Sequence, residues 1–552
     1  MKKLPIAAVL VCVMGVAPAQ ERDHAGVLRG SLQCERPAEG AQRVHSWKLR
    51  ANSAGGLERF GKNDLFERAP DAVAVAGPDG TFALEVPPGS YAVFAFVDRN
   101  GDGTWSPDVP EPCAWRLRVD VPAGGAELAA LQLRAPTHLA RQDRVVANGA
   151  LRWCKGYPVV QLRGDARQRG VAHGELLAAQ IVDFFRDYIL EDRLGGAVAY
   201  REFETFLNTA FVWPDAFLQE IDGVLVGMQQ SGIDLSVPEL GRDFGRCELL
   251  AINAYIETRA MRSSCTQFVA FGERTAGSEI AGGTIAGRNM DGEIDLRRVT
   301  VSHFVLFAVD PSESGQQRFV SMMWPGFVGT LSGFNAAGVH CMENAGGTGP
   351  GPVVDRLQPI SWVMRQALAT FGSDATHADF ESLLAAHANS AGGACGPGCI
   401  VVFALPSAAR EPGWILEGDR FGHASRLPGA VSPRLAGAVM ASNHHLVYGA
   451  DPDRPGTSFG RQPSPSSAWR YEAGQHKLQA WARTGRAIGT AEMRELLQTV
   501  AHGSTEHSII TRPDLREFDV AVASMRAEPW DAPYRPWTTF RFDELFAEAE
   551  VR

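Results

Sequence analysis

The chain has 552 residues, of which 45% are hydrophobic and 21% are charged, so wholesale disorder is excluded. Its 58 glycines and 33 prolines favour a fold with many turns and strands over a helical bundle. The net charge is −10 and the sequence has no basic run. This argues against nucleic-acid binding, because neutralising phosphates requires clustered cations.

The N-terminal segment, residues 1–19, is expected to be a signal peptide. Lys2 and Lys3 precede an apolar stretch over residues 6–16, and small residues at 17–19 form a cleavage site. A membrane-spanning helix needs about 20 apolar residues, and neither this stretch nor any later segment has that length. We therefore expect an exported protein, secreted or periplasmic, without a membrane span.

Residues 25–135 are predicted to form a small β domain. Short strands alternate with turns of the Pro-Pro-Gly and Pro-Asp-Gly type. The pattern resembles the β-sandwich accessory domains of the transthyretin-like and carboxypeptidase-regulatory types. Cys34 and Cys113 are the only cysteines of this region, so we expect them to pair. A polar connector over residues 136–150 follows.

One turn of this domain has the spacing of a calcium loop. Asp98, Asn100 and Asp102 occupy positions 1, 3 and 5 of such a loop, and Gly103 occupies position 6. Position 12 is Val109 where an EF-hand has a glutamate. The alternative is a turn held by its own Asp and Asn side chains, so calcium is a candidate ligand of a loop that is not catalytic.

The remaining chain is predicted to be one α+β domain of about 400 residues. Its first part, residues 151–264, contains a strand that begins at Tyr157 and a helix from Glu175 to Leu190, where apolar residues recur at helical spacing. The second part, residues 265–552, is expected to contain Gly-rich strands over 265–345, a helix around 360–388, further strands, a helix near 491–500 and a closing strand pair that begins near His507.

Cys265 stands out because it lies directly before an apolar strand. A second strand, residues 281–287, leads into Arg288 and Asp291. If residues 266–270 and 281–287 form a hairpin, both charged residues return beside Cys265. A nearby cation lowers the pKa of a thiol, and a carboxylate can orient a base. The spacing therefore indicates a reactive cysteine.

These residues resemble the N-terminal-nucleophile (Ntn) hydrolases of the choloylglycine hydrolase and penicillin acylase group. The resemblance covers about residues 155–525 and is closest to the acyl-coenzyme A:6-aminopenicillanic acid acyltransferase branch, peptidase family C45. One departure is Ser264, where family members often have glycine before the cysteine. The matching segments are Val159–Glu175 in a helical prosegment, Cys265-Thr266, Arg288 and Asp291, the stretch Leu331–Asn344, Ala441-Ser-Asn443-His, Ser466-Ser-Ala-Trp-Arg470-Tyr and the strand that begins at Thr505.

The resemblance implies a four-layer αββα sandwich and a self-cleaving chain. The thiol of Cys265 would break the bond between Ser264 and Cys265, and the freed α-amine would serve as the general base. Asp291 would orient this amine. Arg288 would favour the thiolate and hold Asp291. No cofactor is implied for catalysis.

The same resemblance implies the remaining roles and the substrate. Asn344 and Asn443 would stabilise the oxyanion, and Arg470 would anchor the Cys265 region or a substrate carboxylate. The substrate would be a small linear N-acyl amide, whose acyl group passes through a thioester to water or to an amine. The oligomeric state is not indicated.

Three other functions stay open at this stage. A papain-like protease would depend on a histidine such as His444. A calcium-dependent envelope binding protein would carry a degenerate hydrolase domain. A phospholipase B-like acyl hydrolase would keep the same core. His444 and His445 are not favoured as a metal pair, because neighbouring side chains on a strand point to opposite faces.

The other cysteines are assigned to structure. Cys395 and Cys399 could close a small loop, and Cys154 could pair with Cys247. Cys341 has no obvious partner, and its strand position predicts a buried free thiol.

Overall fold

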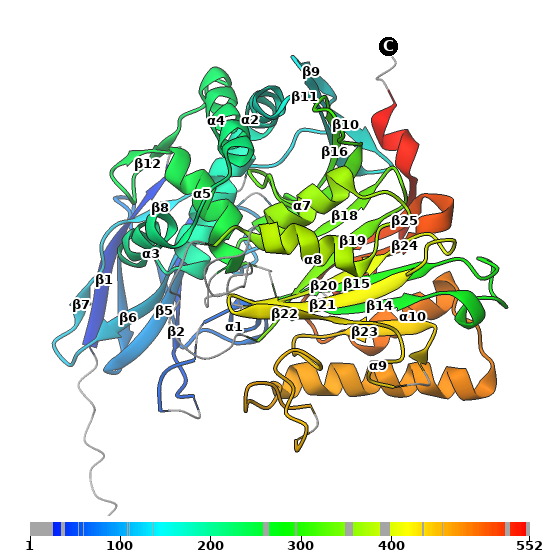
Figure 1. Cartoon of the computed structure of the whole chain (residues 1–552). Coiled ribbons are helices and arrows are strands. Elements are labelled where there is room, and N and C mark those ends of the chain that lie inside the picture. The colour runs from blue at the N-terminus through cyan, green and yellow to red at the C-terminus, as the bar shows by residue number, and fades with distance from the viewer. Residues whose placement is uncertain are drawn as a thin grey trace, which may run out of the picture. The chain divides into compact units, whose positions relative to one another are not determined.

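The computed structural model describes residues 26–547, except for 35–38, 53–54, 59, 107–108, 110, 136, 258–263, 293–294, 348–356, 387–397, 433–434, 455 and 525–529. The expected signal peptide lies outside the described residues. The chain divides into two compact units (Figure 1). Unit 1 comprises residues 1–105 and 111–134, and unit 2 comprises residues 106–110 and 135–552.

Unit 1 contains two four-stranded sheets with a shared core, as in a β-sandwich. Leu28 and Leu84 from one sheet and Val44 and Val93 from the other meet in this core. The likeness to transthyretin-like domains stays a prediction. The elements are β1 (Gly26–Cys34), β4 (Thr81–Val86), β7 (Ala126–Glu127) and β8 (Leu131–Leu133) in the first sheet, β2 (Ala41–Lys48), β3 (Ala72–Val75), β5 (Gly89–Asp98) and β6 (Cys113–Val121) in the second, and helix α1 (Lys62–Glu67).

The predicted disulfide between Cys34 and Cys113 is wrong. Cys34 is a free thiol on β1, and Cys113 lies on β6 in the other sheet. The pairing of Cys154 with Cys247 is wrong as well, because both are free thiols. Spacing along the chain did not reveal which strands and helices are neighbours. Cys395 lies outside the described residues, so its pairing with Cys399 stays a prediction.

The candidate calcium loop is closed by its own hydrogen bonds. The Asp98 carboxylate accepts from the N–H groups of Gly101 and Gly103 and pairs with Arg43 at 2.6 Å. Asp102 accepts from the N–H of Thr104 at 2.8 Å. The turn alternative accounts for these contacts, and the calcium prediction gains no support from the described residues.

Unit 2 is built around two large sheets. The ten-stranded sheet has the order β22-β21-β20-β19-β18-β17-β16-β11-β10-β9, with only β11 and β16 parallel, and the six-stranded sheet has the antiparallel order β23-β14-β15-β24-β25-β26. The strands are β9 (Arg144–Val146), β10 (Gly149–Cys154), β11 (Tyr157–Gly164), β14 (Thr266–Ala270), β15 (Ile285–Asp291), β16 (Val305–Pro311), β17 (Phe319–Met323), β18 (Ser332–Asn335), β19 (His340–Ala345), β20 (Cys399–Ala404), β21 (Gly413–Asp419), β22 (Gly422–Arg426), β23 (Ala438–Ala441), β24 (Thr505–Arg512), β25 (Glu517–Val522) and β26 (Thr538–Arg541), with a small pair β12 (Ser236–Val237) and β13 (Arg242–Asp243).

Helices cover the outer faces of these sheets (Figure 1). One apolar core joins the ten-stranded sheet to α2–α5, η1, α7 and α8, and another joins the six-stranded sheet to α9 and α10. The helices are α2 (Ala166–Asp183), α3 (Ala197–Ala210), α4 (Asp215–Gln230), α5 (Arg246–Ala254), α6 (Val299–Ser302), α7 (Ile360–Thr370), α8 (His377–Ala386), α9 (Pro465–Thr484) and α10 (Thr490–Thr499), with η1 (Phe184–Arg193), η2 (Tyr255–Glu257), η3 (Gly272–Arg274), η5 (Pro513–Leu515), η6 (Ala532–Tyr534) and η7 (Phe542–Phe546).

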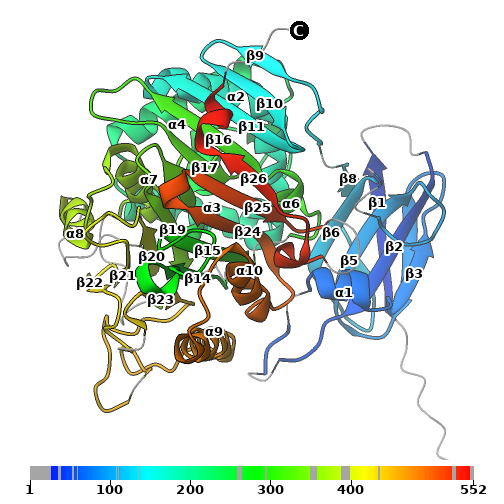
Figure 2. The ribbon, with the colours of Figure 1, turned by 90° about the vertical axis from the view of Figure 1, so that its right-hand side faces the viewer.

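The inner faces of the two sheets pack against each other. Leu306 and Phe334 of the ten-stranded sheet meet Ile509 and Phe518 of the six-stranded sheet. Figure 2 shows β25 and β26 lying across β16 and β17. The prediction of a mixed fold of helices and strands is confirmed. Residues 136–150, expected to be a connector, contribute β9 and the start of β10.

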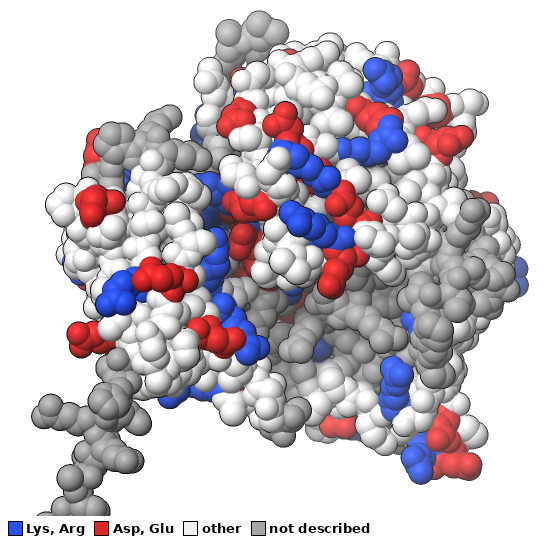
Figure 3. Space-filling view, turned by 90° about the vertical axis from the view of Figure 1, so that its left-hand side faces the viewer, with Lys and Arg blue, Asp and Glu red and all other residues white. Residues whose placement is uncertain are grey.

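The surface carries charges of both signs, and Figure 3 shows Lys and Arg side chains lying among Asp and Glu side chains on that face. Among the described residues, no helix combines the length and apolar character needed to cross a membrane.

Helices α2 and α4 cross with their backbones in close contact at glycines. A Cβ added at Gly227 on α4 would lie 2.0 Å from the carbonyl oxygen of Val171 on α2, and one at Gly174 on α2 would lie 2.0 Å from the carbonyl oxygen of Val224 on α4. Both clashes are with backbone, which cannot rotate away. The helix layer over the ten-stranded sheet thus depends on these small residues.

We expect Gly227→Ala to lower the free energy of unfolding by roughly 1–3 kcal/mol, because the added methyl group forces the two helices apart. Denaturant unfolding measures the change. The control is Gly347→Ala, where an added Cβ meets no atom within 4 Å. A Gly227→Ala protein as stable as the control would contradict the close crossing.

Candidate active site

Cys265 lies immediately before β14, at an edge where both sheets of unit 2 contribute side chains. Strand β14 pairs with β15 and β23, so Gln267 stands opposite Arg288 on one side and Ala441 on the other. The predicted pairing of the two strands is therefore confirmed, with the second strand at Ile285–Asp291 where the sequence predicted residues 281–287. Cys265 is fully buried, and its sulfur is a thiol rather than half of a disulfide.

Arg288 reaches from β15 to the thiol and to the facing sheet. Its Nη2 lies 3.6 Å from Sγ of Cys265, and its Nη1 donates to the carbonyl oxygen of Leu331 at 2.6 Å. It also donates to the hydroxyl of Ser332 and to the carbonyl oxygen of Glu343. The two terminal nitrogens of the guanidinium therefore contact the thiol, β18, β19 and the residue before β18.

Asp291 has other partners than those predicted. Its carboxylate accepts from the hydroxyl of Thr505 and lies 3.3 Å from Nε2 of His502. The predicted ion pair with Arg288 is not formed, although the structure describes both residues. The reason is strand pairing, since β24 places Thr505 directly opposite Asp291. His502, in the segment between α10 and β24, is a site residue that the sequence analysis missed.

Asn443 and Arg470 both contact the backbone of Cys265. Its N–H donates to Oδ1 of Asn443 at 2.9 Å, and Nη1 of Arg470 donates to its carbonyl oxygen at 2.6 Å. Arg470 Nη2 also donates to Oδ1 of Asn443 at 2.8 Å. The nitrogen predicted to become the base thus contacts Asn443, whereas the prediction gave Asp291 that position. Arg470 anchors the Cys265 region, which was one of its two predicted roles.

Asn344 approaches from the ten-stranded sheet. Its Nδ2 donates to the carbonyl oxygens of Ser442 at 2.9 Å and of Cys265 at 3.3 Å. Nδ2 of Asn443 donates to the carbonyl oxygen of Ala345 at 2.8 Å. The two amides proposed as oxyanion donors therefore flank Cys265 and are tied to each other's backbone segments.

Arg470 owes its position to α9, a helix that the sequence analysis did not assign. The helix begins with Ser464 as its N-cap, whose hydroxyl accepts from the N–H of Ser467, and with Pro465 at its first position. Arg470 and Ser467 lie on its buried face. The Ser-Pro start is the signal that could have revealed the helix.

The electrostatics of the site keep the thiol protonated in this chain. Burial raises the pKa of the Cys265 thiol, Arg288 lowers it, and the charges of Asp291 and Glu343 raise it further. The net shift is upward. Reaction at sulfur therefore requires a base that removes the proton, because the thiolate is the nucleophilic form.

His444 is not placed to act as a base for the Cys265 thiol. Its Nδ1 lies 2.7 Å from the hydroxyl of Ser467, and burial lowers its pKa to about 4. This geometry disfavours the papain-like alternative. Among the described residues, no group of three or more His, Cys, Asp or Glu side chains is placed to hold a metal ion.

Comparison with known proteins gives weak similarities. No family model and no curated protein matches the chain. Similar solved structures include an N-acylethanolamine-hydrolyzing acid amidase ortholog from Caenorhabditis elegans (17% identity, TM-score 0.32, covering 46% of this chain and 94% of that one). They also include a variant of the conjugated bile acid hydrolase from Clostridium perfringens (11% identity, TM-score 0.32, covering 52% of this chain and 95% of that one). A third is penicillin V acylase from Agrobacterium tumefaciens (13% identity, TM-score 0.30, covering 47% of this chain and 83% of that one). Because these scores are low, the functional argument rests on the site geometry.

His502 and Asp291 make a pH-dependent contribution to stability. Burial lowers the pKa of His502, but the contact with Asp291 outweighs burial and the net shift is upward. A raised pKa in the folded state stabilises the protein fully below the unfolded value, near 6.5, and this contribution is lost as the pH rises through the folded value.

We expect His502→Gln to lower the free energy of unfolding by on the order of 1 kcal/mol at about pH 5 and by much less at about pH 9. Denaturant unfolding at both pH values measures the difference. An equal loss at the two pH values would show that the ion pair with Asp291 does not stabilise the fold.

Proposed function

We propose that this chain is an exported cysteine amidohydrolase or acyltransferase of the Ntn type, similar to peptidase family C45. One observation carries the proposal. Side chains from separate segments converge on Cys265, with Arg288 at its sulfur, Asn443 at its nitrogen and Arg470 at its carbonyl oxygen. A cysteine that only filled the core would need neither the cation at sulfur nor a side-chain acceptor at nitrogen.

The first reaction in this proposal is activation of the chain itself. Sγ of Cys265 attacks the carbonyl carbon of Ser264, a C–S bond forms, the C–N bond breaks, and the nitrogen takes the thiol proton. Water then hydrolyses the resulting ester of the thiol. The products are a carboxylate on Ser264 and a Cys265 that carries both thiol and α-amine. The N–H of Ser264 donates to the carbonyl oxygen of Asp291 at 3.1 Å, which fixes the bond to be cut.

The α-amine then acts as the general base. An unperturbed α-amine has a pKa of about 7.7–8.0, so a useful fraction is neutral at mildly alkaline pH. It accepts the thiol proton while sulfur attacks the carbonyl carbon of a linear amide. Asn443, which contacts this nitrogen, orients the base. Base and nucleophile thus belong to one residue.

The oxyanion formed in this attack needs hydrogen-bond donors. The Nδ2 groups of Asn344 and Asn443 flank Cys265, and donors of this kind contribute about 10²–10³ in rate each. The protonated amine gives its proton to the departing nitrogen as the C–N bond breaks. Water or an amine then attacks the thioester and regenerates the thiol.

Cys341 offers a matched control for the nucleophile. Like Cys265 it is fully buried in unit 2, and burial raises its thiol pKa well above the ordinary value. Its backbone, however, is part of the regular pairing of β19 with β18 and β20.

We expect hydrolysis of N-acyl amides, measured by release of the free amine, to fall by at least about 10³-fold in Cys265→Ala, because the covalent route is lost. Cys341→Ala should stay within a few fold of the wild type. A Cys265→Ala protein that retains wild-type kcat/KM would contradict the proposal, and so would a wild type with no activity on a broad panel of N-acyl amides.

A further inference from the structure

His502 connects a buried carboxylate of the candidate active site to the surface of unit 2. Its Nε2 lies 3.3 Å from Oδ2 of Asp291. The Asp291 side chain is fully buried, whereas 20% of the His502 side chain is exposed. The histidine can therefore exchange protons with water while its ring stays in contact with a carboxylate that is shielded from water.

Asp291 lies next to Cys265 in the sheet. Its carbonyl oxygen accepts from the N–H of Ser264, the residue before Cys265, at 3.1 Å. The hydroxyl of Thr505 donates to its Oδ1, and its Oδ2 is the atom near His502. Burial raises the pKa of the Cys265 thiol, and the charge of Asp291 raises it further. The same charge would raise the pKa of an α-amine on Cys265, because a nearby anion favours cationic forms and disfavours anionic ones.

The surroundings of His502 favour its charged form on balance. Burial is the largest effect on its pKa and lowers it, and the charge of Arg470 on α9 lowers it as well. The contact with Asp291 on β15 and a hydrogen bond to the histidine's own backbone raise the pKa, and the net shift is upward. The ring is therefore charged at mildly acidic pH and neutral at alkaline pH.

From these contacts we propose that His502 is a positioning residue for the reaction at Cys265, which in its charged form pairs with Asp291 and offsets the negative charge that this carboxylate places beside the thiol. While the pair is neutral overall, the thiol and an α-amine on Cys265 lose their protons more easily. Loss of the histidine proton restores the full effect of Asp291. His502 thus extends the reactivity of Cys265 toward lower pH. This role rests on the proposed function for its rate measurement, whereas the thiol measurement is independent of amide hydrolysis.

Alkylation of Cys265 by iodoacetamide tests this role, because the thiolate is the form that reacts. Peptide mass spectrometry gives the rate at each cysteine at about pH 6 and about pH 9, on either side of the histidine titration. We expect His502→Gln to slow alkylation of Cys265 by roughly 3- to 10-fold at the lower pH and by less than about 2-fold at the higher pH, where the wild-type ring is neutral as well. His502→Lys keeps the charge and should match the wild type at the lower pH.

The variant Asp291→Asn shows whether His502 acts through the carboxylate. Without that carboxylate, burial and the charge of Arg470 favour the neutral ring of His502. Adding His502→Gln to Asp291→Asn should therefore leave the alkylation rate of Cys265 unchanged at about pH 6. A gap as large as in the wild-type background would overturn the proposal, because His502 would then act on the thiol by another route.

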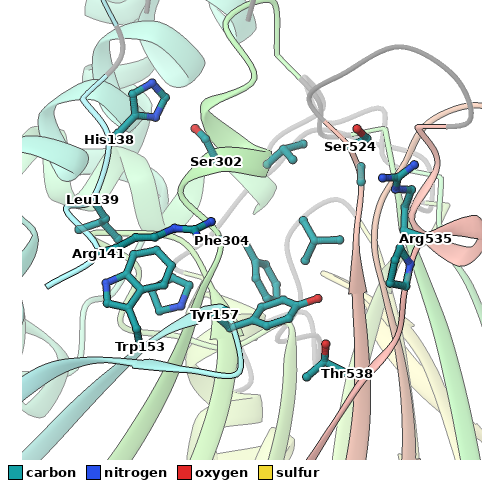
Figure 4. A pocket seen from close by; sticks show the side chains of 16 residues that line it. His138, Leu139, Arg141, Trp153, Tyr157, Ser302, Phe304, Ser524, Arg535 and Thr538 are labelled. Carbon is teal, nitrogen blue, oxygen red and sulfur yellow. The ribbon is translucent and has the colours of Figure 1, made fainter. Parts of the chain in front are cut away.

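His138 provides a matched histidine control. It lines a cavity of about 650 Å³ in unit 2, and the described residues of that lining include neither Cys265 nor Asp291 nor His502 (Figure 4). His138→Gln should therefore leave alkylation of Cys265 unchanged at both pH values. Cys247, a free thiol on α5, is an internal reference that should react at the same rate in every variant.

The pH profile of kcat/KM for an N-acyl amide is the second readout. Its acid limb should move to higher pH in His502→Gln with an unchanged plateau, because an α-amine near an uncompensated carboxylate keeps its proton to higher pH. Equal alkylation of Cys265 in wild type and His502→Gln at the lower pH, or a slowing of the same size at both pH values, would overturn the proposal whether or not the chain hydrolyses amides. The expected alkylation rates in a chain that hydrolyses no amide would support this role of His502 and refute the proposed function.

Discussion

The site depends on two buried guanidinium groups that hold one cysteine from opposite sides. Arg288 starts on the six-stranded sheet and donates to carbonyl oxygens of the ten-stranded sheet, so it ties the two sheets together at the thiol. Arg470 starts on α9 and ties the outer helix layer to the backbone of Cys265. A buried cation is costly unless hydrogen bonds compensate for the lost water, and the terminal nitrogens of both guanidinium groups have such partners. Helix, both sheets and nucleophile are therefore fixed by one set of hydrogen bonds.

The same burial explains why the Cys265 thiol requires a base in order to react. Burial raises the pKa of Cys265, and Arg288 is the group that opposes this rise. Burial also raises the pKa of Glu343, to about 7. Below that pH Glu343 is mainly neutral and does not cancel the field of Arg288 at the sulfur. Because the low dielectric of the site keeps the thiol protonated, the reaction requires a base close to the sulfur. An α-amine on the same residue would provide that base.

The sequence predicted the contacts within one hairpin, but it did not reveal contacts between segments that lie far apart along the chain. The hairpin that brings Arg288 to Cys265 follows from spacing. Asn344, Asn443 and Arg470 came from a family resemblance, and the structure brings all three to Cys265. The predicted disulfides of Cys34 with Cys113 and of Cys154 with Cys247 were wrong, because spacing carries no information about which strands and helices become neighbours. His502 was missed because its contact with Asp291 exists only once β24 pairs with β15.

Intact mass spectrometry of the purified protein beside Cys265→Ala shows whether the chain cuts itself before Cys265. We expect two pieces for the wild type, the second beginning at Cys265, and one uncut piece for the variant. A wild-type chain that stays whole while it hydrolyses acyl amides would refute the mechanism, because no α-amine would then exist to act as the base.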